Sequence, residues 1–389
     1  MSRLASAALL CVALAACGGT QTSPTPTPRA SGSATAGATP TTAAATPSAT
    51  TDPCDVAGQQ PPSGTIAAGF ATALAFAPDG RLFWTERSGT VKVWQNGAAR
   101  DFAHVSTVTI ERGGGYSERG LLGLALSPTF SSDHLVFAFY SDANYTQQHV
   151  IRWRDCAGTA QDAQVIITLP SGADCCHKGG RLAFGPDGML YVTLGEEHTS
   201  SAAQNTGDVR GKILRYRPDG TVPSDNPFGA GNPVYAYGFR NPFGIAFSST
   251  GQMAVTNNGP SGDSGSPSTG YDELYASVQR GTGYQWADCY GYSHPLATSS
   301  CPAGQPGPDW SSERSTVVPT GVTFVDAAGP SAYAGHIVFC TFEGGMRIFT
   351  PGSPHGSVAT GPSTCNLAVV EGPDHALYWS DAGHIYRSA

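Results

Sequence analysis

The sequence predicts an all-β protein, a six-bladed β-propeller built from four-stranded antiparallel blades. The first observation behind this prediction is composition: 49 glycines and 29 prolines in 389 residues, well above the usual share of these two turn-forming residues. The second is that only 13% of the residues are charged, too few to cover the outer faces of a helical protein of this size. The third is a repeated phrase in which an apolar strand, a tight turn and an alternating strand follow one another.

The repeated phrase is clearest after Phe76, Phe184 and Val370, where Pro-Asp-Gly or Gly-Pro-Asp-His separates two apolar segments. Proline presets the first turn position and glycine takes the positive φ that the turn requires. Degenerate copies lie near Leu126, Phe247 and Phe324. Each copy is a strand-turn-strand meander, the unit of a propeller blade. A β-sandwich or a β-helix is the alternative, but six long, irregularly spaced meanders favour the propeller.

The N-terminus predicts export. Residues 1–16 combine Arg3 with a short run of Ala, Leu, Val and Cys, which is typical of a signal peptide and too short for a permanent membrane span. Leu14-Ala-Ala-Cys17 resembles a bacterial lipobox, so we expect Cys17 to be lipidated and to become the first residue of the mature protein. An ordinary secretory signal is the alternative. The predicted location is extracytoplasmic, lipid-anchored at the outer face of a bacterial cell membrane.

Residues 17–52 predict a linker and residues 53–389 the propeller. After Cys17 the linker consists mainly of Thr, Ala, Pro, Ser and Gly and has no aromatic residue, Leu, Ile or Val. Such a segment cannot bury enough apolar surface to offset the entropy of ordering it, so we expect disorder. The formal net charge of −8 argues against a nucleic-acid binder, which would need a basic face.

Eight cysteines remain of the ten once Cys11 and Cys17 are set aside, and an even number in an exported chain predicts four disulfides. We expect Cys289 to pair with Cys301, and Cys340 with Cys365. Cys175 and Cys176 either form a vicinal disulfide or pair separately with Cys54 and Cys156. A four-cysteine zinc site is the alternative, but no Cys-x-x-Cys spacing supports it.

Candidate catalytic residues lie in glycine-rich loops. His177 precedes Gly179-Gly180, and its ordinary pKa suits proton abstraction near neutral pH, although a lone loop histidine is more often structural. Arg240 and Asn241 precede Pro242 and could present a planar cation and an amide to a carboxylate or an oxyanion. An arginine that only fixes its loop is the alternative.

Hard oxygen ligands gather after residue 258. Asp272, Glu273 and the carbonyl groups of Gly259 and Pro260 are the ligand types that Ca²⁺ prefers, although acidic loops often bind no metal. The motifs of zinc proteases, serine hydrolases and Rossmann dehydrogenases do not occur, so these classes have no support.

Taken in order, these segments resemble the soluble glucose/sorbosone dehydrogenase family over residues 60–389. The family implies a six-bladed propeller that uses pyrroloquinoline quinone (PQQ) and Ca²⁺. No single motif is specific, but the ordered set is. Its members here are the blade phrases, Gly120-Leu-Leu-Gly123, His177-x-Gly-Gly-Arg-Leu182, Gly211-Lys-Ile-Leu-Arg215, Asp225-Asn-Pro-Phe228 and Arg240-Asn-Pro242.

The resemblance implies oxidation of an aldose to its lactone, with hydride passing to the quinone. His177 would be the general base, Arg240 would stabilise charge on the quinone oxygen and Asn241 would contact the cofactor. The carbonyl groups of Gly259 and Pro260 would ligate the catalytic Ca²⁺.

Four further positions match the family. Glu273 and Tyr284 match a second, structural Ca²⁺ site, while Glu118 and Glu196 match acidic or amide residues at the active site. The partners implied are an aldose substrate and an electron acceptor that the sequence does not identify.

The resemblance is weakest where the family meets the three PQQ carboxylates with basic residues late in the chain. Here only Arg347 is basic in those stretches, so Lys178, beside His177, is the second candidate to hold a carboxylate. This shortage supports an alternative function, a cofactor-less propeller that binds carbohydrate or protein. A propeller hydrolase or lactonase is a third possibility, but it needs more axis-facing acidic side chains than the sequence offers.

Overall fold

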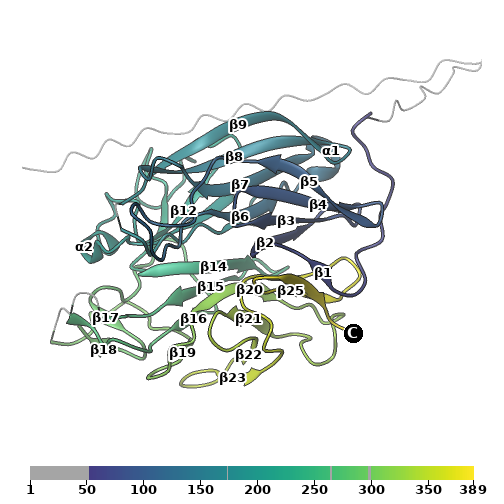
Figure 1. Ribbon diagram of the computed structural model, residues 1–389. Helices are drawn as coiled ribbons and strands as arrows, with labels where there is room; N and C mark the ends of the chain where they lie inside the picture. Colours follow the sequence, from purple (N-terminus) through teal and green to yellow (C-terminus); the bar gives the residue numbers. More distant parts are fainter. Residues whose placement is uncertain (1–51, 173, 263–264, 297–298) are drawn as a thin grey trace, which may run out of the picture. The chain divides into compact units, whose positions relative to one another are not determined.

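The computed structural model describes residues 52–172, 174–262, 265–296 and 299–389 (Figure 1). The predictions for the signal peptide, for Cys17 and for residues 17–51 of the linker lie outside these residues. Contacts between Cα atoms divide the chain into Met1–Thr50 and Thr51–Ala389, and the described residues belong to the second unit. None of the helices in this part of the chain is long and apolar enough to span a membrane.

The described residues form six four-stranded antiparallel sheets, as the sequence predicts. Blade 1 contains β2 (Ala71–Phe76), β3 (Leu82–Glu86), β4 (Thr90–Gln95) and β5 (Ala98–His104). Blade 2 contains β6 (Leu121–Leu126), β7 (Leu135–Ser141), β8 (Gln147–Cys156) and β9 (Thr159–Pro170). Blade 3 contains β10 (Leu182–Phe184), β11 (Leu190–Leu194), β12 (Lys212–Tyr216) and β13 (Val234–Tyr237).

The second half of the chain repeats the pattern. Blade 4 contains β14 (Asn241–Phe247), β15 (Met253–Asn258), β16 (Glu273–Tyr275) and β19 (Trp310–Ser311). Blade 5 contains β20 (Pro319–Phe324), β21 (Ile337–Thr341), β22 (Arg347–Thr350) and β23 (Ser357–Thr360). Blade 6 contains β24 (Val369–Glu371), β25 (Leu377–Ser380), β26 (His384–Arg387) and β1 (Ile66–Ala67). The connections hold α1 (Phe130–Asp133), α2 (Ser200–Ala203) and a small hairpin of β17 (Cys289–Tyr290) and β18 (His294–Pro295).

The first strands of the blades surround the propeller axis. The strands β2, β6, β10, β14, β20 and β24 each contact the first strands of the two neighbouring blades, which closes a ring. In Figure 1 the strands β6 to β9 follow one another from the interior to the outer edge, and β20 to β23 do the same on the other side. The N-terminal ends of the first strands therefore lie at one end of the axis. The predicted turns, which join the first and second strands of the blades, lie at the other end.

The ring closes through a strand that comes from outside the repeat. Ile66 and Ala67 of β1 pair with Ile385 and His384 of β26, so the start of the propeller supplies the fourth strand of the last blade. This pairing removes a free sheet edge and joins the two ends of the domain.

Apolar side chains fill the spaces between the blades. Six clusters among the described residues each join two successive blades, including the junction of blade 6 with blade 1. The junction of blades 1 and 2 is typical: Phe83 and Phe102 pack on Phe130 and Trp153. The alternating apolar positions of the strands thus meet between blades, as burial of both sheet faces requires.

The repeated Pro-Asp-Gly turn has the predicted backbone conformation. Gly188 has φ +72°, and the Asp187 carboxylate accepts the Met189 N–H at 3.1 Å. The same carboxylate accepts the Tyr191 hydroxyl at 3.0 Å and Arg215 Nε at 2.9 Å, which ties the turn to the next two strands of the blade. One aspartate therefore fixes both the turn and the register.

The disulfide predictions are confirmed. The structure has Cys289–Cys301 and Cys340–Cys365, and of the two possibilities left open for the remaining cysteines it has Cys54–Cys156 with the vicinal pair Cys175–Cys176. Cys54–Cys156 joins the segment before β1 to the end of β8 in blade 2, across 102 residues of sequence.

Candidate active site

An open cavity lies at the end of the axis where the first strands begin. Apolar and aromatic side chains make up much of its wall, and two arginines and one glutamate carry its charge. The lining residues are Phe70, Thr72, Arg87, Tyr116, Ser117, Glu118, Leu122, Arg181, Phe243, Asn258, Val318, Thr320, Phe342 and Leu367. All six blades or the loops that enter them contribute, which is the placement expected of a propeller site.

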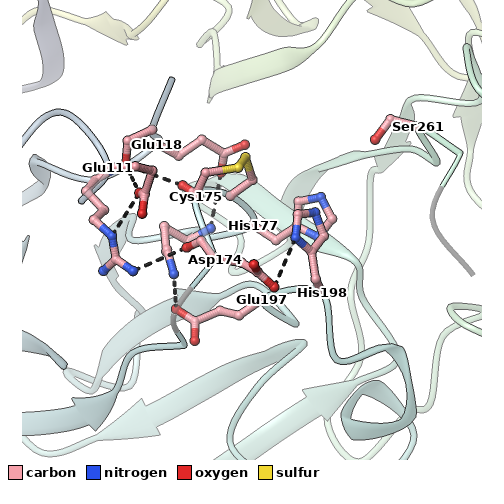
Figure 2. Close-up of a disulfide and its surroundings, with 12 residues drawn as sticks. Glu111, Glu118, Asp174, Cys175, His177, Glu197, His198 and Ser261 are labelled. Carbon is pink, nitrogen blue, oxygen red and sulfur yellow. Dashed lines mark hydrogen bonds and ion pairs between the residues drawn. A yellow bond between two sulfur atoms is a disulfide. The ribbon is translucent and has the colours of Figure 1, made fainter. Parts of the chain in front are cut away.

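His177 lies beside this cavity, on the loop that leads into β10. It is 3% exposed, and its backbone is in the left-handed region, with φ +57°. Its Nδ1 hydrogen-bonds Oε1 of Glu196, which follows β11. The His198 ring packs edge-on against the imidazole, with 4.1 Å between the ring centroids (Figure 2). Because an ionised carboxylate only accepts hydrogen bonds, this contact favours the tautomer in which Nδ1 carries the proton; in the neutral imidazole Nε2 then carries the lone pair.

The backbone around His177 leaves no room for larger residues. A Cβ atom on Gly195 would overlap the His177 carbonyl oxygen, so the segment after β11 approaches this loop as only glycine allows. The Glu196 N–H in turn donates to the Arg240 carbonyl at 2.8 Å, which links blade 3 to the start of blade 4.

A buried ion pair holds the next residue. Lys178 Nζ lies 2.9 Å from Glu197 Oε1, and neither side chain is exposed to solvent. Burial lowers the pKa of Lys178, while Glu197 opposes this shift. Figure 2 shows Glu197 below the disulfide and His177. Lys178 therefore points into the protein rather than into the cavity, and the prediction that it holds a cofactor carboxylate has no support in this geometry.

The loop before His177 is fixed by Arg119. The guanidinium donates to Ser171 Oγ at 2.7 Å and to the Gly172 and Asp174 carbonyl oxygens at 2.6 and 3.2 Å. The carbonyl of Cys175, in the vicinal disulfide, accepts the Glu118 N–H at 2.9 Å. The disulfide loop is thus attached to the strand that begins blade 2.

Glu118 and Asn241 connect the loops across the end of the axis. Asn241 Nδ2 donates to Glu118 Oε2 at 3.1 Å and to Asn258 Oδ1 at 3.2 Å, while its Oδ1 accepts the Gly179 N–H at 3.0 Å. Glu118 Oε2 also accepts the Lys178 N–H at 3.1 Å. The predicted residues from blades 2, 3 and 4 therefore meet in one network.

Arg240 extends this network to the loop after β15. It is 2% exposed; Nη2 donates to Ser261 Oγ at 2.7 Å, and Nη1 lies 3.4 Å from the Asn258 carbonyl oxygen. Its guanidinium carbon lies 5.6 Å from the centre of the Trp286 ring. Arg240 is held at the same end of the axis as His177.

The calcium-ligand candidates divide into two groups. Gly259 and Pro260 are buried directly after β15, and the Gly259 N–H donates to Asp272 Oδ1 at 2.9 Å. Both oxygens of Glu273 accept hydrogen bonds, from the Gly291 N–H at 2.8 Å, Asn257 Nδ2 at 2.7 Å and the Tyr275 hydroxyl at 3.1 Å. A cation at Glu273 would have to displace these donors.

Two other predicted residues lie elsewhere. The Tyr284 hydroxyl accepts the Gln279 N–H at 2.9 Å inside the cluster between blades 3 and 4. Arg347 Nη1 donates to the Gly344 carbonyl at 2.6 Å on β22, and Arg347 is not among the cavity-lining residues. Among the described residues no group of three or more His, Cys, Asp or Glu side chains is placed to hold a metal.

The sequence analysis missed two arginines of the cavity. Arg181 is part of the segment that begins at His177, and Arg87 follows β3. Arg87 donates to the carbonyl groups of Thr109, Ser117 and Arg119. Their positions in the sequence could have indicated this role. Arg87 directly follows a second strand and Arg181 directly precedes a first strand, and these strand ends lie at the same end of the axis.

The fold and the cavity define a propeller protein with an aromatic-walled space at one end of the axis. Two arginines and a glutamate line this space, and the His177–Glu196 pair lies on the adjoining loops. The chain belongs to the family described as Glucose / Sorbosone dehydrogenase, whose model matches residues 70–350.

Two curated relatives are named as sugar dehydrogenases. The chain is 28% identical over 256 residues to quinoprotein glucose dehydrogenase B of Acinetobacter calcoaceticus, covering 57% of this chain and 50% of that protein. It is 30% identical over 240 residues to the aldose sugar dehydrogenase YliI of Escherichia coli, covering 58% and 59%. The chain thus spans about half the length of the curated relatives it matches.

A solved structure shares the fold. The PQQ-bound form of aldose sugar dehydrogenase from Streptomyces coelicolor aligns with 84% of this chain and 98% of its own, with a TM-score of 0.66 and 23% identity.

Proposed function

We propose that the protein is a PQQ- and Ca²⁺-dependent aldose dehydrogenase that oxidises a sugar to its lactone. The observation that carries the proposal is that the His177 loop, Arg240 and Asn241, from blades 3 and 4, are held directly behind the cavity of a glucose/sorbosone dehydrogenase propeller. They contact two of its lining residues, Glu118 and Asn258. The name of the Acinetobacter relative, a quinoprotein, supports the same cofactor class.

The cavity fits a flat aromatic polyanion. Phe70, Phe243 and Phe342 supply apolar walls, and two guanidinium groups, Arg87 and Arg181, line the same space. Within the described part of the chain no carboxylate oxygen lies within 4 Å of either guanidinium. Cations and aromatic faces are the chemistry that recognises a tricarboxylate quinone. These arginines also remove the reason for the cofactor-less alternative, which was the shortage of basic residues late in the chain.

His177 takes the proton from the anomeric hydroxyl of the sugar. Glu196 holds Nδ1 protonated, so Nε2 is the basic atom, and the pair keeps the imidazole in one orientation while it becomes positively charged. PQQ bound in this cavity would supply the chemistry of a two-electron hydride acceptor for the anomeric carbon. The buried Arg240 places positive charge where negative charge develops on the acceptor, and Asn241 orients the site through its amide.

Ca²⁺ would lie beside the loop that follows β15. The carbonyl groups of Gly259 and Pro260 are hard oxygen ligands at the end of the axis where His177 lies. Oxygen atoms of a bound cofactor would supply further ligands to the ion. We do not extend the proposal to Glu273 and Tyr284, because the Glu273 carboxylate already has three donors.

We further propose that the protein is exported and held at the outer face of the membrane through lipid on Cys17, as the N-terminal sequence predicts. Metabolic labelling with a fatty acid analogue would test this, with Cys17→Ala as the control. Label on the variant equal to that on the parent protein would refute it.

The function is tested by reconstitution. The purified protein with PQQ and Ca²⁺ is expected to reduce an artificial electron acceptor only when an aldose is added. His177→Asn removes the general base and should lower kcat by about 10²- to 10⁴-fold. Glu196→Gln should lower kcat less, because the imidazole is still present as the base and only its orientation is weakened. His375→Asn, an exposed histidine of blade 6, is the matched control. No turnover with any of a range of aldoses would refute the proposal.

A further inference from the structure

Arg181 occupies the base of the cavity. It lines both the cavity and the space inside the channel beneath it, which the first strands of the blades enclose. At this level each blade contributes one residue, either from its first strand or from the one or two positions before that strand. These six residues are Thr72, Leu122, Arg181, Phe243, Thr320 and Leu367. Five are uncharged, so the guanidinium of Arg181 carries the charge of this ring.

The guanidinium has few partners. Arg181 is 6% exposed; Nη1 donates to the Leu122 carbonyl, and its carbon lies 4.5 Å from the centre of the Phe243 ring. Nη2 is buried without a hydrogen-bond partner, and no carboxylate of the described residues lies within 4 Å. A buried donor without a partner needs an explanation, and at the base of a cavity a bound ligand would supply one.

The charge at this position is costly without an anion. Burial alone lowers the pKa of Arg181 to about 9, so the group is still charged at neutral pH. Two other buried cations have carboxylate partners, Lys178 with Glu197 and Arg81 with Asp79 and Asp155. A third, Lys212, has no carboxylate partner among the described residues, but its Nζ donates to three carbonyl oxygens, whereas Arg181 Nη2 has no acceptor. An isolated buried charge destabilises a fold unless something pairs with it. Arg181 is therefore better explained by a ligand than by packing.

The surroundings restrict the ligand. Phe70, Phe243 and Phe342 present aromatic walls, and Arg87 adds a second positive group at the rim. Glu118, the acidic residue of the lining, directs Oε2 toward the Asn241 amide and the Lys178 N–H. A planar aromatic body with a carboxylate directed to the base satisfies the walls and the unpartnered donor together.

We propose that Arg181 is the buried carboxylate subsite of the cavity and binds one carboxylate of a flat aromatic polycarboxylate. The inference rests on the proposed function, in which PQQ is that ligand. It assigns the deepest cation of the cofactor site to the loop of the catalytic histidine, rather than to the late segments that the sequence analysis considered.

The test measures binding rather than turnover. The full protein without cofactor is titrated with PQQ at constant Ca²⁺, using quenching of tryptophan fluorescence, and then with PQQ trimethyl ester, in which no carboxylate is charged. Arg181→Met removes the charge at similar length, and Arg181→Lys keeps it without the planar fork. The matched control is Arg347→Met, which removes an arginine outside the cavity.

We expect Arg181→Met to weaken PQQ binding by about 10- to 100-fold, the size of a charge-assisted hydrogen-bond pair, and Arg181→Lys to weaken it less. Arg347→Met should bind as the parent does, and the ester should bind all four proteins equally. Without ligand, Arg181→Met should melt no lower than the parent, because it removes an unpaired buried charge.

Two results would overturn the inference. Unchanged PQQ affinity in Arg181→Met would do so while leaving the proposed function intact. A ligand-free melting temperature several degrees lower in both Arg181 variants would show that the guanidinium serves packing. Failure of the parent protein to bind PQQ would instead refute the proposed function, and the inference with it.

Discussion

The buried pair of Lys178 and Glu197 gives the sharpest prediction about stability. Replacing Glu197 with Gln removes the negative charge 2.9 Å from Lys178 Nζ. An ammonium group with no solvent exposure then has only neutral acceptors, the new amide oxygen and the Gly172 carbonyl oxygen 3.3 Å away. Breaking a buried pair at one partner costs about 3–5 kcal/mol of the free energy of unfolding. Because Lys178 precedes two glycines of the histidine loop, the same change should loosen the loop that carries His177.

The cost should depend on pH. Burial lowers the pKa of Lys178 in the folded protein below its ordinary value of 10.5, and loss of Glu197 lowers it further. Between the folded and unfolded pKa values the unfolded chain binds more protons, so stability rises with pH in that window. The difference between the parent and Glu197→Gln should therefore be largest near pH 6 and shrink toward pH 10.

Urea unfolding of four proteins measures these effects. The parent and Glu197→Gln are compared with Lys178→Met/Glu197→Gln, which removes both charges, and with Asp101→Asn, which breaks the exposed pair of Lys92 and Asp101. The double variant should recover part of the stability that Glu197→Gln loses, while Asp101→Asn should cost less than about 1 kcal/mol. A Glu197→Gln cost as small as that of Asp101→Asn, or one that grows with pH, would refute the reasoning.

Three further predictions concern other parts of the fold. Replacing Cys54 and Cys156 together with Ser should lower the free energy of unfolding by about 2–4 kcal/mol in urea, because this disulfide closes a loop of 102 residues; an unchanged midpoint would contradict this. Gly195→Ala should lower kcat by about 10- to 100-fold with the circular dichroism spectrum preserved, since a Cβ overlaps the His177 carbonyl oxygen; full activity would show that the loop has room to move. Burial raises the pKa of Glu273 to about 7, above its unfolded value, so stability should fall by about 3 kcal/mol as pH rises from about 4.5 to 7, and a parent and Glu273→Gln with identical pH profiles would rule this out.

The fold was predictable because its signal is local and repeated. Each predicted copy corresponds to the first and second strands of one blade, and the turns at Gly80 and Gly188 have the positive φ that the phrase requires. Closure by β1 was not predictable in the same way. Ile66 and Ala67 form a strand of two residues without the repeated phrase, and their partner, β26, lies at the far end of the sequence.

The candidate site was predictable where position alone determines it. His177, Arg240 and Asn241 come just before or at the start of first strands, and the topology brings these strand ends together. The roles of Lys178 and Arg347 depend instead on tertiary partners. The Lys178 side chain points toward Glu197, and the Arg347 side chain points toward the Gly344 carbonyl group in its own hairpin. The sequence pattern does not predict either orientation.

The scarcity of basic residues is better judged by pairing than by number. Two cations lie three residues apart in the histidine loop, Lys178 and Arg181, and the strand geometry sends them in different directions. Lys178 meets a carboxylate inside the protein, so its charge is already neutralised and it contributes structure. Arg181 meets a carbonyl group, an aromatic face and an open cavity, so its charge remains available to a ligand. A propeller with few cations can hold an anionic cofactor if it leaves the right one uncompensated, and the geometry makes Arg181 that cation.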